Sequence, residues 1–202
     1  QVYTTTHVYS ALAVPQRLRD IGMEPYLVYD HNLVRGMFCQ RLARGLCEHC
    51  RLSLEEAVKE MGPIYRELRQ RVRAGLALMD ASRKHGEDVA LDHLEEPDLR
   101  HVYVANPEGC KHCYRGRVGR TICAEVIETD HKIMSLLQEN DLEGARKYWL
   151  SPDGLRGVTM LWHVLEKVRR GDVCPTDAEF EIGILAREED IIAVEERLGG
   201  IK

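Results

Sequence analysis

Apolar and polar residues follow patterns that divide the chain into short predicted elements. Residues 2–6 (VYTTT) are β-branched and aromatic, which predicts a strand. Ser10 is placed to cap a helix over residues 10–20. Pro25 is placed to open a second helix, which is expected to continue through Phe38. The chain is therefore predicted to begin with one strand followed by two helices.

The clearest helical pattern lies between residues 53 and 83. Ser53 and Glu56 form the capping box S-x-x-E, which predicts the start of a helix. A longer helix is expected after Pro63, because apolar residues recur there at helical spacing and predict a buried face. These apolar residues are Ile64, Leu68, Val72, Leu76 and Met79. Arginines off this stripe are expected on the solvated face, namely Arg66, Arg69 and Arg73.

The rest of the chain is predicted to contain two strands and a helical C-terminal part. Residues 101–105 (HVYVA) and 120–127 (RTICAEVI) alternate as strands do. Beyond residue 130 the pattern is helical, with predicted helices at 132–138, 141–150, 158–170 and 177–186. These patterns together predict an α/β fold that is mainly helical.

Composition argues against several classes of protein. The net charge is −5 and 6% of the 202 residues are aromatic, which does not suit a nucleic-acid-binding surface. No apolar run approaches the ~20 residues needed to cross a bilayer. Seven cysteines, an odd number, do not suit a secreted disulfide scaffold and fit a reducing cytoplasm. The isolated ones are expected to be small core residues, namely Cys39, Cys123 and Cys174.

The other four cysteines form two C-x-x-C knuckles, CEHC at 47–50 and CKHC at 110–113. Two knuckles can present four thiolates to one tetrahedral ion, and such a closed shell is typical of structural zinc. We therefore predict a structural zinc ion bound by Cys47, Cys50, Cys110 and Cys113. The alternatives are unmetallated cysteine pairs or redox motifs, although a redox C-x-x-C is usually single and opens a helix after a strand.

The segment between the knuckles is long. It contains 59 residues, more than a small zinc ribbon uses, and is expected to fold as a helical excursion. His49 and His112 lie inside the knuckles. We expect both to be bystanders, because four thiolates already fill a tetrahedral shell.

Three further segments carry candidate chemistry. His7 follows the predicted first strand, where α/β folds place ligand contacts, and is a candidate phosphate contact or an ordinary loop histidine. Arg41 and Arg44 are candidate contacts to phosphates or carboxylates, or ordinary surface arginines. Residues 114–120 (YRGRVGR) form a basic patch or simply a turn. The sequence contains no G-x-x-x-x-G-K-[ST] loop and hence no phosphate cradle of that kind.

In this order, these segments resemble the C-terminal half of the motor ATPases of type II secretion, type IV pilus and related conjugative pilus systems. That family has a T-x-H box, an R-L-x-D-[MI]-G-[VIM]-E-P-[FY] segment and a Q-R-L-x-R-x-L-C stretch. Two C-x-x-C knuckles follow, the second continued by G-Y-R-G-R-x-G, and a T-M-x-x-x-x-L-x-K-V-x-x-G tail closes the pattern. Here Tyr114 follows Cys113 directly, without the family's usual spacer residue. The matching residues are Thr5–His7, Arg17–Tyr26, Gln40–Cys47, Cys113–Gly119 and Thr159–Gly171. The long excursion and the tail after Cys174 depart from the family pattern and suggest a plasmid- or conjugation-type branch.

The resemblance implies a place within a larger machine. In the family, the phosphate-binding loop and the Walker B carboxylates precede the T-x-H box, so we expect the C-terminal part of a longer hexameric ATPase. That protein would use ATP and Mg²⁺ to power pilus assembly or secretion, in the cytoplasm at the inner membrane. Residues 1–46 would belong to a RecA-like core, 47–113 to a tetracysteine zinc lobe, and 114–202 to a β segment with C-terminal helices.

The resemblance also implies roles for residues. His7 would contact the nucleotide near its terminal phosphate, while Arg41 and Arg44 would contact the nucleotide or a neighbouring subunit. The zinc lobe would dock on an inner-membrane platform protein, with no nucleic acid as a partner. These 202 residues alone are not expected to hydrolyse ATP. The competing interpretation is a self-contained, non-enzymatic, zinc-stapled protein-interaction module.

Overall fold

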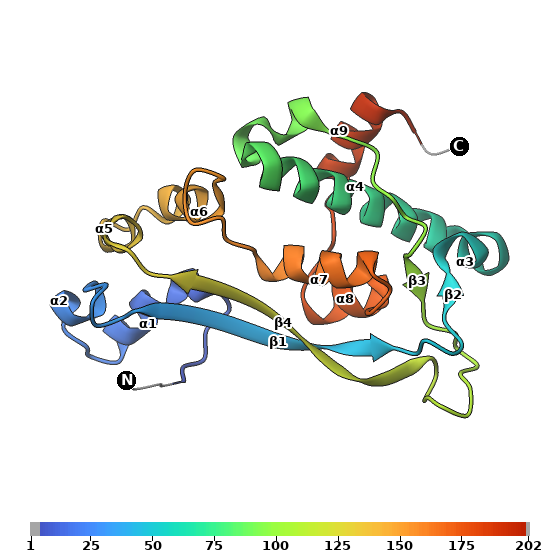
Figure 1. The fold of residues 1–202 in the computed structure, drawn as a ribbon, viewed down its shortest axis with the longest axis horizontal. Helices are drawn as coiled ribbons and strands as arrows, with labels where there is room; N and C mark the ends of the chain where they lie inside the picture. Colours follow the sequence, from blue (N-terminus) through green and yellow to red (C-terminus); the bar gives the residue numbers. More distant parts are fainter. Residues whose placement is uncertain (1–4, 201–202) are drawn as a thin grey trace. The chain divides into compact units, whose positions relative to one another are not determined.

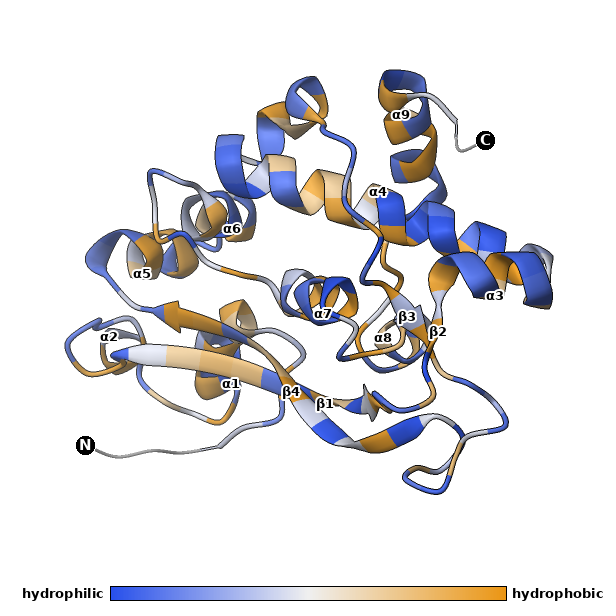
Figure 2. Cartoon of the chain, turned by 45° about the vertical axis from the view of Figure 1, so that its right-hand side comes forward, coloured by the Kyte–Doolittle hydropathy of each residue, from blue (hydrophilic) through white to orange (hydrophobic). Residues whose placement is uncertain are grey.

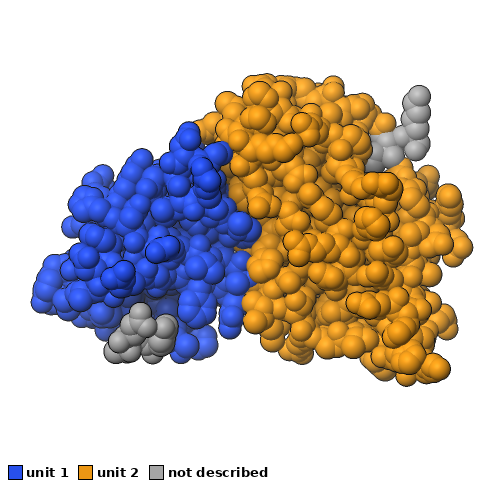
Figure 3. Space-filling model, in the orientation of Figure 1, with its two compact units in different colours: residues 1–40, 124–159 blue, residues 41–123, 160–202 orange. Residues whose placement is uncertain are grey.

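The computed structural model describes residues 5–200 and has a mixed helix and strand architecture that is mainly helical, as predicted (Figure 1). The chain forms two compact units, shown in Figure 3. Unit 1 contains residues 1–40 and 124–159, and unit 2 contains residues 41–123 and 160–202. Two long strands, β1 (Gly36–Leu46) and β4 (Arg117–Glu128), pair with each other and contribute residues to both units.

Unit 1 begins with the predicted helix over residues 10–20. It starts as a 3-10 turn, η1 (Ala11–Ala13), and continues as α1 (Val14–Asp20). Ser10 caps it as predicted, since its Oγ accepts a hydrogen bond from the Leu12 amide at 3.3 Å. The first predicted strand is not seen at Thr5 and Thr6, and the rest of it lies outside the described residues.

The second predicted helix is much shorter than expected. It forms one turn, α2 (Pro25–Val28), and the prediction that it continues through Phe38 is wrong. Strand β1 already begins at Gly36, and its side chains alternate, with Met37 and Cys39 buried and Phe38 exposed. Hydrogen bonds to a distant strand, β4, stabilise this alternation, and no local signal reveals that partner.

The remainder of unit 1 consists of the end of β4 and two predicted helices, α5 (His131–Gln138) and α6 (Leu142–Leu150). Asp130 caps α5 by accepting a hydrogen bond from the Ile133 amide at 2.8 Å. Trp149 on α6 is buried, and its indole N–H donates to the Val126 carbonyl of β4 at 3.1 Å. Helix α6 is thereby fixed to the sheet by a satisfied polar group within the core.

Unit 2 contains the long excursion between the cysteine knuckles. The capping box of α3 (Leu54–Met61) is formed as predicted, with the Ser53 amide 2.9 Å from the Glu56 carboxylate and the Glu56 amide 3.2 Å from the Ser53 hydroxyl. Helix α4 (Pro63–His85) follows, and Figure 2 shows an apolar middle between hydrophilic ends. It packs against η2 (Glu87–His93) and against three C-terminal helices. These are α7 (Met160–Arg169), α8 (Pro175–Glu181) and α9 (Glu188–Leu198).

The predicted stripe on α4 is buried except at its first residue. Leu68, Val72, Leu76 and Met79 are at most 1% exposed, whereas Ile64 is 69% exposed. The prediction that Arg73 faces solvent is also wrong, because it is buried. Its guanidinium forms an ion pair with Glu96 at 2.6 Å and donates to the Gly199 carbonyl at 2.8 Å. Neighbouring elements therefore cover more of α4 than one face.

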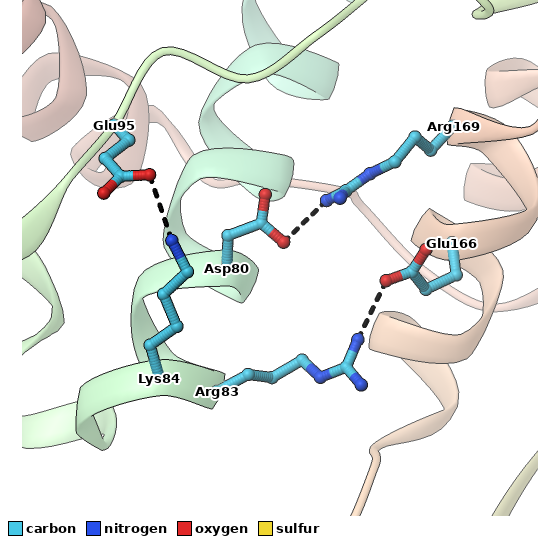
Figure 4. Close-up of polar contacts among 6 residues, drawn as sticks. All are labelled: Asp80, Arg83, Lys84, Glu95, Glu166 and Arg169. Carbon is cyan, nitrogen blue, oxygen red and sulfur yellow. Dashed lines mark hydrogen bonds and ion pairs between the residues drawn. The ribbon is translucent and has the colours of Figure 1, made fainter.

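Ion pairs fasten the C-terminal half of α4 to its neighbours (Figure 4). Asp80 pairs with Arg169 of α7 at 2.7 Å, and Arg83 pairs with Glu166 of α7 at 2.8 Å. Lys84 pairs with Glu95, beyond η2, at 3.0 Å. The first two pairs join α4 to α7, although each exposed pair contributes little to stability by itself.

Short strands and the end of the chain complete unit 2. Strand β2 (Leu52–Ser53) pairs antiparallel with β3 (Tyr103–Val104), which returns the excursion to its starting point. The helix predicted at 177–186 is wrong in extent, because α8 ends at Glu181 and a separate helix, α9, follows.

Candidate metal centre

The first knuckle begins where β1 ends. The Cys47 amide donates to the Gly116 carbonyl at 2.9 Å, which ties the first knuckle to the segment after the second. The Arg51 amide donates to the Cys47 carbonyl at 3.1 Å and closes the turn that contains Cys50. The turn brings both thiols of the first pair to one side of the backbone.

The second knuckle is a similar turn. The Cys113 amide donates to the Cys110 carbonyl at 3.1 Å, and the Cys110 amide donates to the Cys113 sulfur at 3.2 Å. Gly116 lies in the next turn, in which Tyr114 and Arg117 exchange backbone hydrogen bonds. Its φ is +77, and a Cβ there would lie 2.7 Å from backbone atoms of Asn106. Only glycine allows both the left-handed conformation and this close approach.

The four sulfur atoms converge, although 59 residues separate the two pairs. They all lie within 4.8 Å of one another. The Cys47–Cys110 sulfur distance is 3.8 Å, and the Cys50–Cys113 and Cys110–Cys113 distances are both 3.6 Å. A tetrahedral ion with metal–sulfur bonds of about 2.3 Å would hold its sulfurs about 3.8 Å apart. The spacing therefore fits one tetrathiolate metal site and is too long for disulfide bonds.

The thiols differ in acidity. Burial, followed by hydrogen bonds with the other three thiols, raises the pKa of Cys50 to about 12. Burial opposes ionisation of Cys113 as well, but hydrogen bonds from the Cys110 and Gly116 amides and from neighbouring thiols outweigh it and lower its pKa to about 7. Four thiolates this close repel one another, so a cation is needed to hold all of them ionised.

The remaining residues around the knuckles lie outside the sulfur cluster. His49 and His112 are exposed, and their rings contact each other with centroids 4.2 Å apart. The three other cysteines are buried, as predicted for core residues; they are Cys39, Cys123 and Cys174.

Arginines beside each knuckle attach the cluster to the C-terminal helices of unit 2. Arg51 follows Cys50, donates to the Gly171 carbonyl at 2.8 Å, and lies 4.1 Å from the centre of the Tyr103 ring. Arg117, in the predicted basic patch, forms an ion pair with buried Asp177 of α8 at 2.7 Å. Sequence patterns gave no sign of these partners, because they lie 120 and 60 residues away.

The other predicted site residues are not part of this cluster. His7 is exposed in unit 1, in a segment without regular structure before η1. Arg41 and Arg44 lie on the unit 2 part of β1. Arg41 donates to the Glu181 carbonyl at the end of α8 at 3.0 Å, while Arg44 is exposed.

Glu125 is a buried polar residue that the sequence patterns missed. Glu125 on β4 is 6% exposed and accepts a hydrogen bond from the Ala11 amide. The available signal was its position, because it occupies the buried row of β4 between Cys123 and Ile127. A carboxylate in such a row needs a buried donor.

Within residues 5–200, no helix combines the length and the apolar character needed to cross a bilayer.

Comparison with known proteins gives a consistent result. The chain is 28% identical over 181 residues to type II secretion system protein E of Dickeya dadantii, covering 84% of this chain and 29% of that protein. It is 27% identical over 184 residues to a type IV pilus assembly ATPase of Acinetobacter baylyi, covering 83% of this chain and 26% of that protein. It is 30% identical over 145 residues to type II secretion system ATPase E of Vibrio cholerae, covering 71% of this chain and 22% of that protein.

The chain thus spans under a third of the length of these relatives. The sequence profile of the family described as type II/IV secretion system protein matches residues 1–179, which include every segment of the resemblance. The chain therefore belongs to the type II/IV secretion system protein family.

Proposed function

We propose that this chain is the C-terminal part of a motor ATPase that powers pilus assembly or type II secretion. The family match over residues 1–179 carries the proposal, and the relatives include proteins named as ATPases of both systems. In the longer protein, ATP and Mg²⁺ would bind to a RecA-like core whose last part is residues 1–46. We infer that residues 47–113 form the zinc lobe, and that 114–202 supply the β segment and C-terminal helices.

Zinc is the metal we propose for the tetracysteine site. Four thiolates without an open position favour Zn²⁺ in a structural role, because zinc accepts tetrahedral sulfur coordination and is not redox-active. The sulfur spacing of 3.6–3.8 Å supports such coordination. The ion would hold the two ends of the excursion together and would take no part in ATP hydrolysis.

Metal analysis of the purified, reduced chain tests the zinc proposal. We expect one zinc ion per chain, and we expect Cys113→Ser to lower this content strongly. Cys39→Ser is the matched control, because Cys39 belongs to unit 1 and is not one of the four clustered cysteines. Its variant should keep full zinc content. A folded, reduced chain without metal, or with a redox-active metal in place of zinc, would contradict the proposal.

The nucleotide roles follow from the proposed parent protein. His7 would contact the terminal phosphate region and stabilise charge that develops during transfer, while Arg41 and Arg44 would contact the nucleotide or an adjacent subunit. In the full-length protein, His7→Ala should lower ATP turnover far more than nucleotide affinity, because such a contact strengthens in the transition state. Parallel ATPase assays and nucleotide titrations check this. Unchanged turnover in His7→Ala would show that His7 is an ordinary loop histidine.

The assembly we propose is a hexamer in the cytoplasm, at the inner membrane, with the zinc lobe docked on a platform protein of the machine. These 202 residues alone should neither hydrolyse ATP nor bind it tightly, because they contain no phosphate-binding loop. Robust hydrolysis by this chain alone would overturn the proposal. A folded zinc protein whose full-length gene product lacks ATPase activity would favour the interaction module instead.

A further inference from the structure

The segment that follows His7 forms hydrogen bonds to the unit 1 parts of β1 and β4. The thiol of Cys39 on β1 donates to the Val8 carbonyl at 3.5 Å. The buried carboxylate of Glu125 on β4 accepts from the Ala11 amide. Two contacts, three residues apart, therefore fix the backbone between His7 and the start of the helix.

Of these two contacts, the one to Glu125 constrains the backbone more, because it lies at the start of a helix. The first amides of a helix have no partner within the helix. Ser10 satisfies the next two, since its hydroxyl accepts from Leu12 at 3.3 Å and its carbonyl accepts from Ala13 at 3.1 Å. Glu125 supplies the acceptor for Ala11, which is itself fully buried, and its charge complements the positive end of the helix.

A carboxylate in this row is costly unless it has a specific task. Its neighbours in the buried row of β4, Cys123 and Ile127, are 0% exposed. An apolar residue would fill the same row without desolvation cost, but it would leave the Ala11 amide unpaired in the core. The position of Glu125 thus stabilises one particular path of residues 7–11.

We propose that Glu125 is a positioning residue for His7. It holds the start of η1, and through it the loop that carries His7, in the geometry at which the imidazole meets the nucleotide. This inference rests on the proposed role of His7 as a phosphate contact. Glu125 itself touches no nucleotide. A displacement of about 1 Å at a reacting group is enough to lower turnover by about 100-fold.

The first test distinguishes the effect of the hydrogen bond that Glu125 accepts from the effect of its negative charge. Glu125→Met has a similar length but no acceptor, whereas Glu125→Gln keeps an acceptor oxygen without the charge. In the full-length protein, we expect Glu125→Met to lower kcat by about 10- to 100-fold with less than a twofold change in nucleotide affinity. Glu125→Gln should keep most of the wild-type kcat, because its amide oxygen can still accept the hydrogen bond. Glu128→Met, at an exposed position on the same strand, is the matched control and should match the wild type.

The second test removes the donor of the same hydrogen bond, the Ala11 amide. Ala11→Pro removes the amide hydrogen, and proline is tolerated at the first position of a helix. It should reproduce the effect of Glu125→Met on kcat, and it provides the test if Glu125→Met does not fold. Hydrogen exchange in the 202-residue chain gives a readout without catalysis. The Ala11 amide should lose at least tenfold protection in Glu125→Met and keep most of it in Glu125→Gln.

The outcomes distinguish this inference from the proposed function. If His7→Ala leaves turnover unchanged, the proposed role of His7 fails, and this inference fails with it. If His7→Ala lowers turnover while Glu125→Met and Ala11→Pro do not, only the positioning role is overturned. The double variant His7→Ala/Glu125→Met should be no slower than His7→Ala alone, because both changes remove one contact. Additive losses would contradict a role exerted through His7.

Discussion

At the scale of single residues, two arginines connect the cysteine knuckles to the C-terminal helical region of unit 2. Arg51 and Arg117 each lie within four residues of a knuckle cysteine, and each reaches the C-terminal helical region of unit 2. Arg51 donates to the carbonyl of Gly171, a glycine at φ +74 whose Cβ would lie 2.5 Å from the Tyr103 ring. The knuckles therefore depend on a tightly packed corner after α7 as well as on their own turns.

Replacing Arg51 by methionine tests this dependence. Arg51→Met removes a charge-assisted hydrogen bond to Gly171 and a cation–π contact with Tyr103, so we expect the free energy of unfolding to fall by about 2 kcal/mol. Arg66→Met, on the exposed surface of α4, is the control and should change stability by less than about 0.5 kcal/mol. Urea denaturation of the zinc-loaded chain measures both. Equal free energies of unfolding for Arg51→Met and Arg66→Met would show that the contacts of Arg51 with Gly171 and Tyr103 do not stabilise the knuckles.

At the scale of elements, α4 organises unit 2. It packs against η2 and α7, α8 and α9, and a small apolar cluster joins Ala74 and Ala77 to Ala186 and Val194 from the C-terminal end of the chain. The family match ends at residue 179, so α9 lies beyond the matched region. The long excursion therefore packs against a helix that lies beyond the matched region.

Two substitutions on the predicted stripe of α4 test whether the stability of the protein depends on the burial of a residue or only on its place in the helical spacing. Leu76 is 0% exposed and Ile64 is 69% exposed, although both follow the same helical spacing. Leu76→Ala should lower the free energy of unfolding by about 2–5 kcal/mol through lost burial and a residual cavity. Ile64→Ala should cost less than about 1 kcal/mol. Denaturant midpoints check the difference, and similar losses at both positions would contradict the packing of α4.

At the scale of the whole molecule, the chain forms two compact units. Unit 1 holds the His7 segment, and unit 2 holds the four-cysteine cluster. The cluster closes the 59-residue excursion, which contains α3, α4 and η2. Loss of the proposed zinc ion should therefore affect unit 2 first, because the binding free energy of a structural metal contributes to folding.

Metal removal tests the independence of the units. After chelation of the purified chain, hydrogen exchange should become faster at the knuckles, in residues 46–51 and 109–117. Exchange in α5 and α6 of unit 1 should remain unchanged. Readdition of zinc should restore protection, while magnesium, which prefers oxygen ligands, should not. Uniform loss of protection across both units would show that they unfold together.

The sequence by itself determined the local features. Ser10 and Ser53 cap their helices where the pattern predicts, because a cap depends on hydrogen bonds within three residues. The four cysteines were identifiable because each knuckle is a local motif. Strand β4 and helices α5 and α6 were likewise predicted close to their observed bounds. The assignment of zinc and the roles of His7, Arg41 and Arg44 stay predictions.

The tertiary structure decided which residues are buried and what they contact. Strand β1 replaced the end of a predicted helix because it pairs with β4, about eighty residues away. Arg73 is buried because it contacts Glu96 and the end of α9, whereas Ile64 at the start of α4 is 69% exposed. Glu125 found its donor in Ala11, 114 residues away. Helical and strand periods describe one segment at a time, whereas burial depends on which distant segments pack against it.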